Sequence, residues 1–140
     1  MNLTLNTDLI ENVIYDEITV GQSARLLRTL TLADIQAFAS VSGDVNPLHL
    51  DAAYANETLF HGMIAHGMWG GALISALLGT QFPGPGTVYL EQDLRFTKPV
   101  RIGDTLTVTV TVVSKDDANK HVELDCQVVN QKGGKVLHGI

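Results

Sequence analysis

Two residues whose side chains can move protons stand close together in the first half of the chain. Residues 42–51 read SGDVNPLHLD, so the carboxylate of Asp44 and the imidazole of His49 lie five positions apart, on either side of a proline. Carboxylate and imidazole groups are common general acids and bases. By spacing alone, catalysis and a structural role are equally supported, because aspartate often caps turns and histidine beside proline can simply pack.

A second short motif strengthens the catalytic reading. Residues 65–68 read AHGM and open an apolar, glycine-rich segment that we expect to be helical. The first turn of a helix offers free backbone N–H groups to an anion. A carboxylate, an imidazole and such N–H groups together suit the addition of water to a bond next to a carbonyl, or its removal.

The helix expected before the first motif is marked by its two ends. Thr31 and Asp34 have the spacing of a capping box, and Gly43 can end the helix. This leaves residues 44–49 in a loop and predicts a short second helix over residues 51–56. The residues of the first helix that we expect to face the core are Leu32, Ile35, Phe38 and Ala39.

A longer central helix is predicted from His66 to Gly79. It is apolar nearly all round, and such a helix in a globular protein should be buried. Gly67, Gly70 and Gly71 lower its helix propensity by up to ~1 kcal/mol each relative to alanine. Close approach of another backbone or a ligand would explain them, and so would tight packing against a sheet.

The second half of the chain is predicted to be an antiparallel meander, because apolar and polar residues alternate there. The expected strands are residues 24–30, 90–96, 105–112, 122–129 and 136–137, with a hairpin turn at residues 132–135. One curved antiparallel sheet wrapped around one long helix accommodates this order. The prediction is an α+β fold in a single domain spanning residues 1–140.

The composition of the 140-residue chain excludes several classes of function. The formal net charge is −6 and the Lys and Arg residues are scattered, which argues against nucleic-acid binding. Lys98 and Arg101 are the cations that we would assign to an anionic substrate, although two cations at a strand end are commonly just solvated. We see no secretory signal, and the apolar stretch at residues 67–78 is shorter than the roughly 20 residues that cross a membrane. We therefore expect a cytoplasmic protein with no membrane association.

The remaining cysteine and histidines favour structural roles. The single cysteine, Cys126, excludes an internal disulfide and should face the core. His66 adjoins the expected helix start and is read as structural, whereas His61 and His121 are expected to face solvent. No pair of histidines has the spacing of a zinc-binding helix, so we predict no metal and no cofactor.

Three stretches of the sequence resemble one known family. SGDVNPLHLD, IAHGM and LRFTKPVRIGDTL are together similar to the MaoC-like, (R)-specific enoyl-CoA hydratase family, over about residues 31–129. The resemblance implies a hotdog fold and hydration of trans-2-enoyl-CoA to (R)-3-hydroxyacyl-CoA. It also implies a homodimer or higher homo-oligomer as the working unit, with an acyl-CoA thioester as the substrate.

The resemblance assigns roles to individual residues. Asp44 and His49 take the catalytic positions and would hold one water molecule between them. The backbone N–H of Gly67 would receive the thioester carbonyl oxygen. The hydroxyl of Ser75 would support the site, and Asn46 would organise the loop.

Two other functions remain as alternatives. A hotdog acyl-CoA thioesterase would release free thiol and would not need Asp44 and His49 in this loop. A non-catalytic acyl-CoA-binding module of a larger acyltransferase is the second, since similar domains occur at the N-terminus of proteins fused to a phosphate acetyltransferase. The last strand is short, so we expect that it is truncated and that the natural protein extends beyond Ile140.

Overall fold

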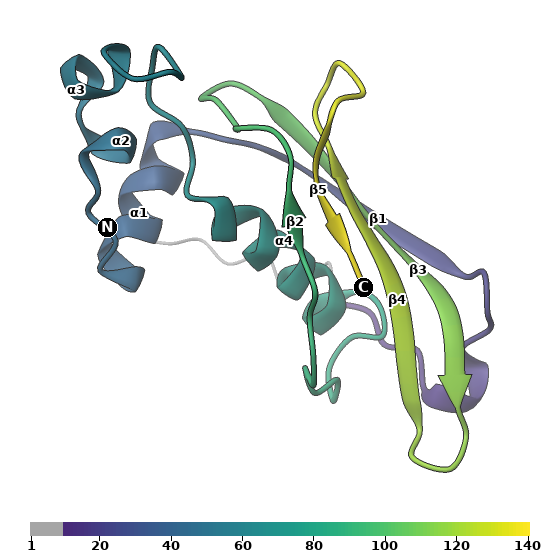
Figure 1. Cartoon of the computed structure of the whole chain (residues 1–140). Coiled ribbons are helices and arrows are strands. Elements are labelled where there is room, and N and C mark those ends of the chain that lie inside the picture. Colours follow the sequence, from purple (N-terminus) through teal and green to yellow (C-terminus); the bar gives the residue numbers. More distant parts are fainter. Residues whose placement is uncertain (1–9) are drawn as a thin grey trace.

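One antiparallel sheet and the helices around it make up the protein (Figure 1). The computed structural model describes residues 10–140. The first part of the N-terminal stretch in which we saw no secretory signal therefore lies outside the described residues. The strands are β1 (Ser23–Thr29), β2 (Arg95–Phe96), β3 (Thr105–Asp116), β4 (His121–Val129) and β5 (Lys135–Gly139). They pair in the order β1-β3-β4-β5-β2, with every neighbouring pair antiparallel.

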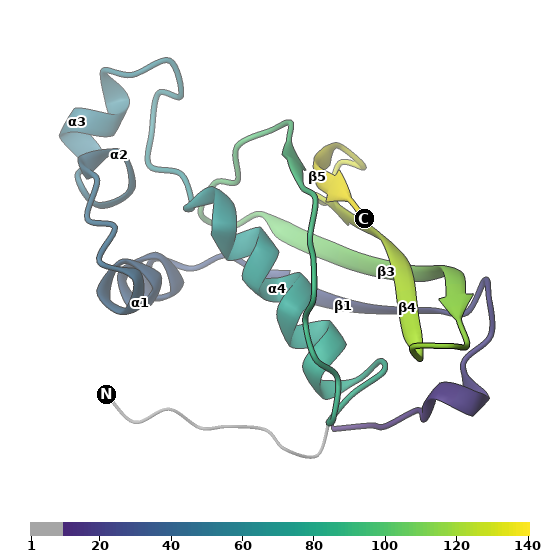
Figure 2. The ribbon, with the colours of Figure 1, turned by 60° about the horizontal axis from the view of Figure 1, so that its bottom comes forward.

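The α-helices gather on one face and at one end of this sheet, and the short 3₁₀ turn η2 (Tyr15–Glu17) lies near the opposite end, beside β3. The α-helices are α1 (Leu32–Ser42), α2 (Pro47–Leu50), α3 (Ala52–Asn56) and α4 (Gly67–Thr80). The long helix α4 lies against the sheet, and α1, α2 and α3 lie beyond its N-terminal end (Figure 2). This is the α+β hotdog arrangement that the resemblance implied. None of the helices within residues 10–140 has the length and apolar character needed to cross a membrane.

The core forms between α4 and the inner face of the sheet. The inward residues of β3 are at most 1% exposed, and these are Leu106, Val108, Val110 and Val112. Their alternation with half-buried threonines confirms the period-2 prediction for this strand. Cys126 on β4 is buried as predicted, and Ile74 and Leu77 of α4 complete the same cluster.

The central helix is less buried than we expected. One face of α4 packs on the sheet, and there Gly70 lies so close to Leu137 of β5 that a Cβ atom would overlap it. Tight packing against the sheet therefore explains this glycine. The opposite face, which carries Met68, Ala72, Ser75, Ala76 and Gly79, is exposed, so the prediction of all-round burial was wrong.

Other local predictions need correction. Only Arg95 and Phe96 of the expected strand at residues 90–96 pair as a strand, with His138 and Leu137 of β5, and the Asp93 N–H donates to the Ile140 carbonyl beyond them. Residues 47–49, expected in a loop, belong to the one-turn helix α2 (Pro47–Leu50). Leu32, at the first position of α1, was expected to face the core but is exposed, although it shares a helix face with the buried Ile35 and Ala39. The capping box at Thr31 and the end of α1 at Gly43 are confirmed.

Candidate active site

The end of α1 sets the direction of Asp44. Gly43 adopts a left-handed conformation with φ 78°, which a residue without a side chain takes at little cost. The Asp44 N–H then donates to the hydroxyl of Ser42 at 3.1 Å. Oδ1 of the Asp44 carboxylate accepts from the Asn46 N–H at 3.2 Å, which leaves Oδ2 without a hydrogen bond from residues 10–140. The carboxylate is thus held by one oxygen and presents the other.

Asn46 starts the helix that carries His49. Its side-chain oxygen accepts from the Leu48 N–H at 3.0 Å, and Pro47 occupies the first helical position. Proline is favoured there because its missing N–H would have no partner in the helix. Asn46 therefore caps α2, and α2 turns His49 toward the start of α4, where its ring stacks on that of His66.

The protonation pattern of His49 follows from its partner. Its Nδ1 lies 2.8 Å from the carbonyl oxygen of Ile64, and a carbonyl oxygen can only accept a hydrogen bond. Nδ1 therefore carries the hydrogen, and Nε2 of the neutral ring keeps its lone pair. The imidazole is 8% exposed, so a base with a fixed orientation sits in a nearly closed environment.

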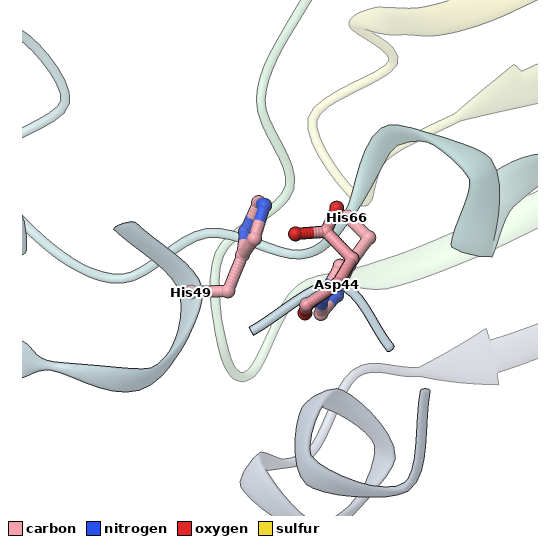
Figure 3. Close-up of side chains that lie close together, drawn as sticks. All are labelled: Asp44, His49 and His66. Carbon is pink, nitrogen blue, oxygen red and sulfur yellow. The ribbon is translucent and has the colours of Figure 1, made fainter. Parts of the chain in front are cut away.

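Three titratable side chains meet at this point (Figure 3). One ligating atom each from Asp44, His49 and His66 lies within 4.8 Å of the others. The rings of His49 and His66 stack with centroids 3.9 Å apart and an interplanar angle of 25°. His66 was assigned only a structural place from the sequence. Its position directly before Gly67 in the AHGM motif was the available signal that it belongs to the site.

The start of α4 faces the same cluster with free donors. His66 is the N-cap residue, and its side chain makes no capping hydrogen bond to the helix. Among residues 10–140 no acceptor is paired with the N–H of Gly67, which is exposed. The helix dipole places partial positive charge at this end. The ring of Phe96 lies 3.3 Å from where a Cβ atom of residue 67 would stand, so glycine keeps the approach to this N–H open.

The three side chains do not form a good cation site in this arrangement. Ring-nitrogen lone pairs lie in the plane of the imidazole, and two stacked rings direct them alongside each other instead of toward one ion. Nδ1 of His49 and Nε2 of His66 donate to backbone carbonyl groups, so the ring lone pairs that stay available are those of Nε2 of His49 and Nδ1 of His66. The absence of a metal therefore remains a prediction from the sequence.

Ser75, assigned a supporting role by resemblance, lies away from this cluster. It is on the exposed face of α4, eight residues after Gly67 and so about 12 Å further along the helix axis. No hydrogen bond joins it to Asp44 in the described part of the chain. The structure therefore does not bring Ser75 to the site of its own chain.

The two candidate cations stand at the edge of the site region. A guanidinium N–H of Arg101 donates to the carbonyl of Phe60, and its backbone bridges to Ile64, two residues before His66. Lys98 is exposed, and its backbone N–H donates to the Val136 carbonyl at 3.3 Å. One guanidinium N–H of Arg101 is thus already hydrogen-bonded within the protein, while the Lys98 side chain is exposed.

Comparison with known proteins gives a consistent picture. The sequence matches the MaoC like domain over residues 17–132. An (R)-specific enoyl-CoA hydratase of Rhodospirillum rubrum is 49% identical over 108 residues, which cover 77% of this chain and 75% of the relative. Another, from Aeromonas caviae, is 42% identical over 120 residues, with 86% and 90% of the two chains covered.

The solved structures agree with the sequences. The unliganded R-hydratase PhaJ1 from Pseudomonas aeruginosa matches with a TM-score of 0.87 and 52% identity, covering 91% of this chain and 82% of that one. The R-hydratase from Aeromonas caviae matches with a TM-score of 0.84 and 42% identity, covering 87% and 92%. With its fold, its motifs and these relatives in agreement, the chain belongs to the MaoC-like family of hotdog proteins.

Proposed function

We propose that this protein is an (R)-specific enoyl-CoA hydratase, a lyase that adds water to trans-2-enoyl-CoA and reverses the same step. The observation that carries the proposal is the meeting of the Asp44 carboxylate, the Nε2 lone pair of His49 and the free N–H groups at the start of α4. Relatives named (R)-specific enoyl-CoA hydratase at 49% and 42% identity support it.

The water molecule is activated by the two side chains together. Nε2 of His49 accepts one proton from the water as its oxygen bonds to C3 of the substrate, while Oδ2 of Asp44 accepts a hydrogen bond from the other O–H. The electron pair of the C2–C3 double bond moves toward the thioester carbonyl. The imidazolium of His49 then returns its proton to C2, so the ring ends the cycle neutral and the product is a 3-hydroxyacyl thioester.

The charge that develops on the thioester oxygen needs its own partner. The Gly67 N–H supplies it, because this donor has no acceptor within residues 10–140 and stands at the positive end of the α4 dipole. A donor held in place before the reaction need not reorganise during it, and losing one such donor in other enzymes lowers the rate by roughly 10²–10³. Lys98 and Arg101 are proposed as contacts for the anionic part of CoA.

The test follows the absorbance of the enoyl thioester. Purified protein is mixed with crotonyl-CoA beside the variants His49→Gln and His121→Gln. His121 is the matched control because it is an exposed histidine on β4, away from the site. We expect loss of the enoyl band with wild type and His121→Gln, near-complete loss of that activity in His49→Gln, and no release of free thiol.

Each alternative predicts a different result. Free thiol released from a saturated acyl-CoA would indicate a thioesterase. Tight binding of acyl-CoA without turnover, unchanged in His49→Gln, would indicate a binding module. Equal hydration rates in wild type and His49→Gln would remove the proposed base from the mechanism.

We further propose that the working unit is at least a homodimer in the cytoplasm, built from the single domain of residues 1–140. The exposed face of α4 consists largely of small residues, and large apolar side chains stand exposed beside it at Val88, Leu90 and Phe96. A second copy packed there would cover this surface, and only in such an assembly could Ser75 support a site, that of the other copy. Light scattering on the purified protein measures the mass directly, and a monomer at working concentration would contradict the proposal.

A further inference from the structure

His66 stands where three helices of the site region meet. Its ring is 4% exposed and packs between His49 of α2, with centroids 3.9 Å apart, and Phe38 of α1, with centroids 4.9 Å apart. Its backbone caps α4, the helix whose first N–H groups face the site. One side chain thus touches or borders each element that carries part of the proposed machinery.

The second contact of His66 is a directed hydrogen bond. Its Nε2 lies 2.8 Å from the backbone carbonyl oxygen of Asp44, so Nε2 carries the hydrogen and donates. This bond joins residues 22 positions apart in the chain and ties the Asp44 loop to the start of α4. Because Nε2 carries the hydrogen, Nδ1 of the neutral ring keeps a lone pair.

The Nδ1 lone pair of His66 indicates that the residue does more than fill space. Nδ1 of His66 is buried and has no hydrogen-bond partner among residues 10–140. A buried acceptor without a partner is destabilising, so packing alone does not account for a second ring nitrogen at this position. What an apolar side chain cannot supply is the Nε2–H donor.

We propose that His66 is a positioning residue for the hydration reaction. Its ring face holds the His49 imidazole, and its Nε2–H holds the Asp44 backbone, so one side chain fixes the separation of the two groups that share the water. The proposal rests on the proposed function. It assigns His66 no contact with the substrate and no proton transfer.

Two substitutions separate the two contacts. His66→Gln keeps an N–H near the Nε2 position and removes the ring, whereas His66→Phe keeps the ring and removes the donor. Displacing a catalytic group by about 1 Å can lower a rate 10²-fold, so we expect each variant to lose roughly 10- to 100-fold in kcat with crotonyl-CoA. The KM should stay within about threefold of wild type, because substrate contacts are intact. Melting temperature is measured in parallel, and His121→Gln again serves as the control.

A second measurement does not depend on any variant. Nitrogen-15 NMR of the wild-type histidines, recorded above the ordinary titration range of the side chain, reports which nitrogen carries hydrogen. We expect Nε2–H for His66 and Nδ1–H for His49, and loss of the single-tautomer signal of His49 in a folded His66→Gln.

The results decide the proposal as follows. Folded His66 variants with wild-type kcat would overturn it, and so would a wild-type spectrum with His66 protonated at Nδ1. If the variants do not fold, the wild-type spectrum alone decides. Absence of turnover in wild type, with both tautomers as expected, would contradict the proposed hydratase activity and leave the arrangement of His66 established.

Discussion

Strand β3 and the segment from Asp44 to Gly67 are built on opposite principles. In β3, apolar side chains enter the core at every second position, and no residue on that inner face needs a specific partner. In the segment from Asp44 to Gly67, short helices and turns are held by hydrogen bonds from side chains to nearby backbone groups. Asn46 and Asp51 each cap the helix that follows them.

The difference shows where stability and chemistry are located in this fold. Burial on β3 is non-directional, so it gives free energy of folding without fixing any one group accurately. Capping bonds are individually modest, but they fix direction, and a site requires direction. Changes on the inner face of β3 should therefore lower the unfolding free energy at constant activity. Changes to the proposed reacting groups between Asp44 and Gly67 should lower activity at nearly constant unfolding free energy.

The largest expected effect is on the rate. Asp44→Asn and His49→Gln are nearly isosteric, and each removes one proton-handling group, so kcat should fall by roughly 10²–10⁴. The melting temperature should remain close to that of wild type. The measurement is crotonyl-CoA hydration together with thermal unfolding, and a large loss of stability in Asp44→Asn would contradict the proposed division.

The next largest effect is on stability. Leu106→Ala on β3 removes a fully buried side chain and should cost about 2–5 kcal/mol of unfolding free energy. The kcat per folded molecule should not change, as chemical denaturation and an activity assay can show. Thr107→Ala, on the outward face of the same strand, is the matched control and should lose far less.

An intermediate effect is expected at the start of α4. Gly67→Ala places a methyl group against the ring of Phe96 and shifts the N–H that we assign to the thioester oxygen. A shift of this kind should lower kcat roughly 10- to 100-fold. Gly67→Ala combined with Phe96→Ala removes the contact and should recover part of the rate. If the double variant recovers no activity, the loss in Gly67→Ala is caused by a change in α4 itself and not by the contact with Phe96.

The smallest effect concerns the capping box of α1 and depends on pH. Partial burial raises the pKa of Asp34, but hydrogen bonds from Thr31 and the Arg28 guanidinium at 2.6 Å lower it, and the net pKa lies below 3.8. Because the folded-state pKa is depressed, Asp34 stabilises the protein above the unfolded-state pKa, and this contribution is lost as pH falls through the folded-state value. Asp34→Asn should therefore lower the unfolding free energy by up to about 1 kcal/mol at neutral pH.

The control for that prediction is the pH itself. Below the folded-state pKa of Asp34, wild type and Asp34→Asn should unfold at the same denaturant concentration, since both side chains are then uncharged. A difference that persists unchanged in acid would mean that geometry, and not charge, carries the effect.

The same division explains what could be predicted from the sequence. Alternation in β3 and β4 and the capping box of α1 are local patterns, and they predicted those elements correctly. The pairing of residues 90–96 depends on which backbone lies beside them in the fold, and the exposure of one face of α4 depends on what covers it. Neither is encoded locally, so both predictions were wrong.

The residues of the candidate site were predicted only in part. The motif identified Asp44 and His49, and their meeting follows from the turn at Pro47. It did not identify His66 as a member of the cluster, since its contacts with Asp44 and His49 arise only when the start of α4 meets the Asp44 loop and α2 in the folded protein. The resemblance therefore proposed the reacting groups, and tertiary packing was needed to show which side chains contact them.

The groups proposed to react all lie in one uninterrupted stretch of chain, from Asp44 to Gly67. Strands β1, β3, β4 and β5 lie before or after this stretch and contribute none of the three clustered side chains. Mutations can therefore accumulate in the sheet without altering the spacing of the reacting groups. Conversely, exchange of this one segment could transfer the proposed reacting groups to a related hotdog protein. The segment could then be inherited or exchanged independently of the sheet.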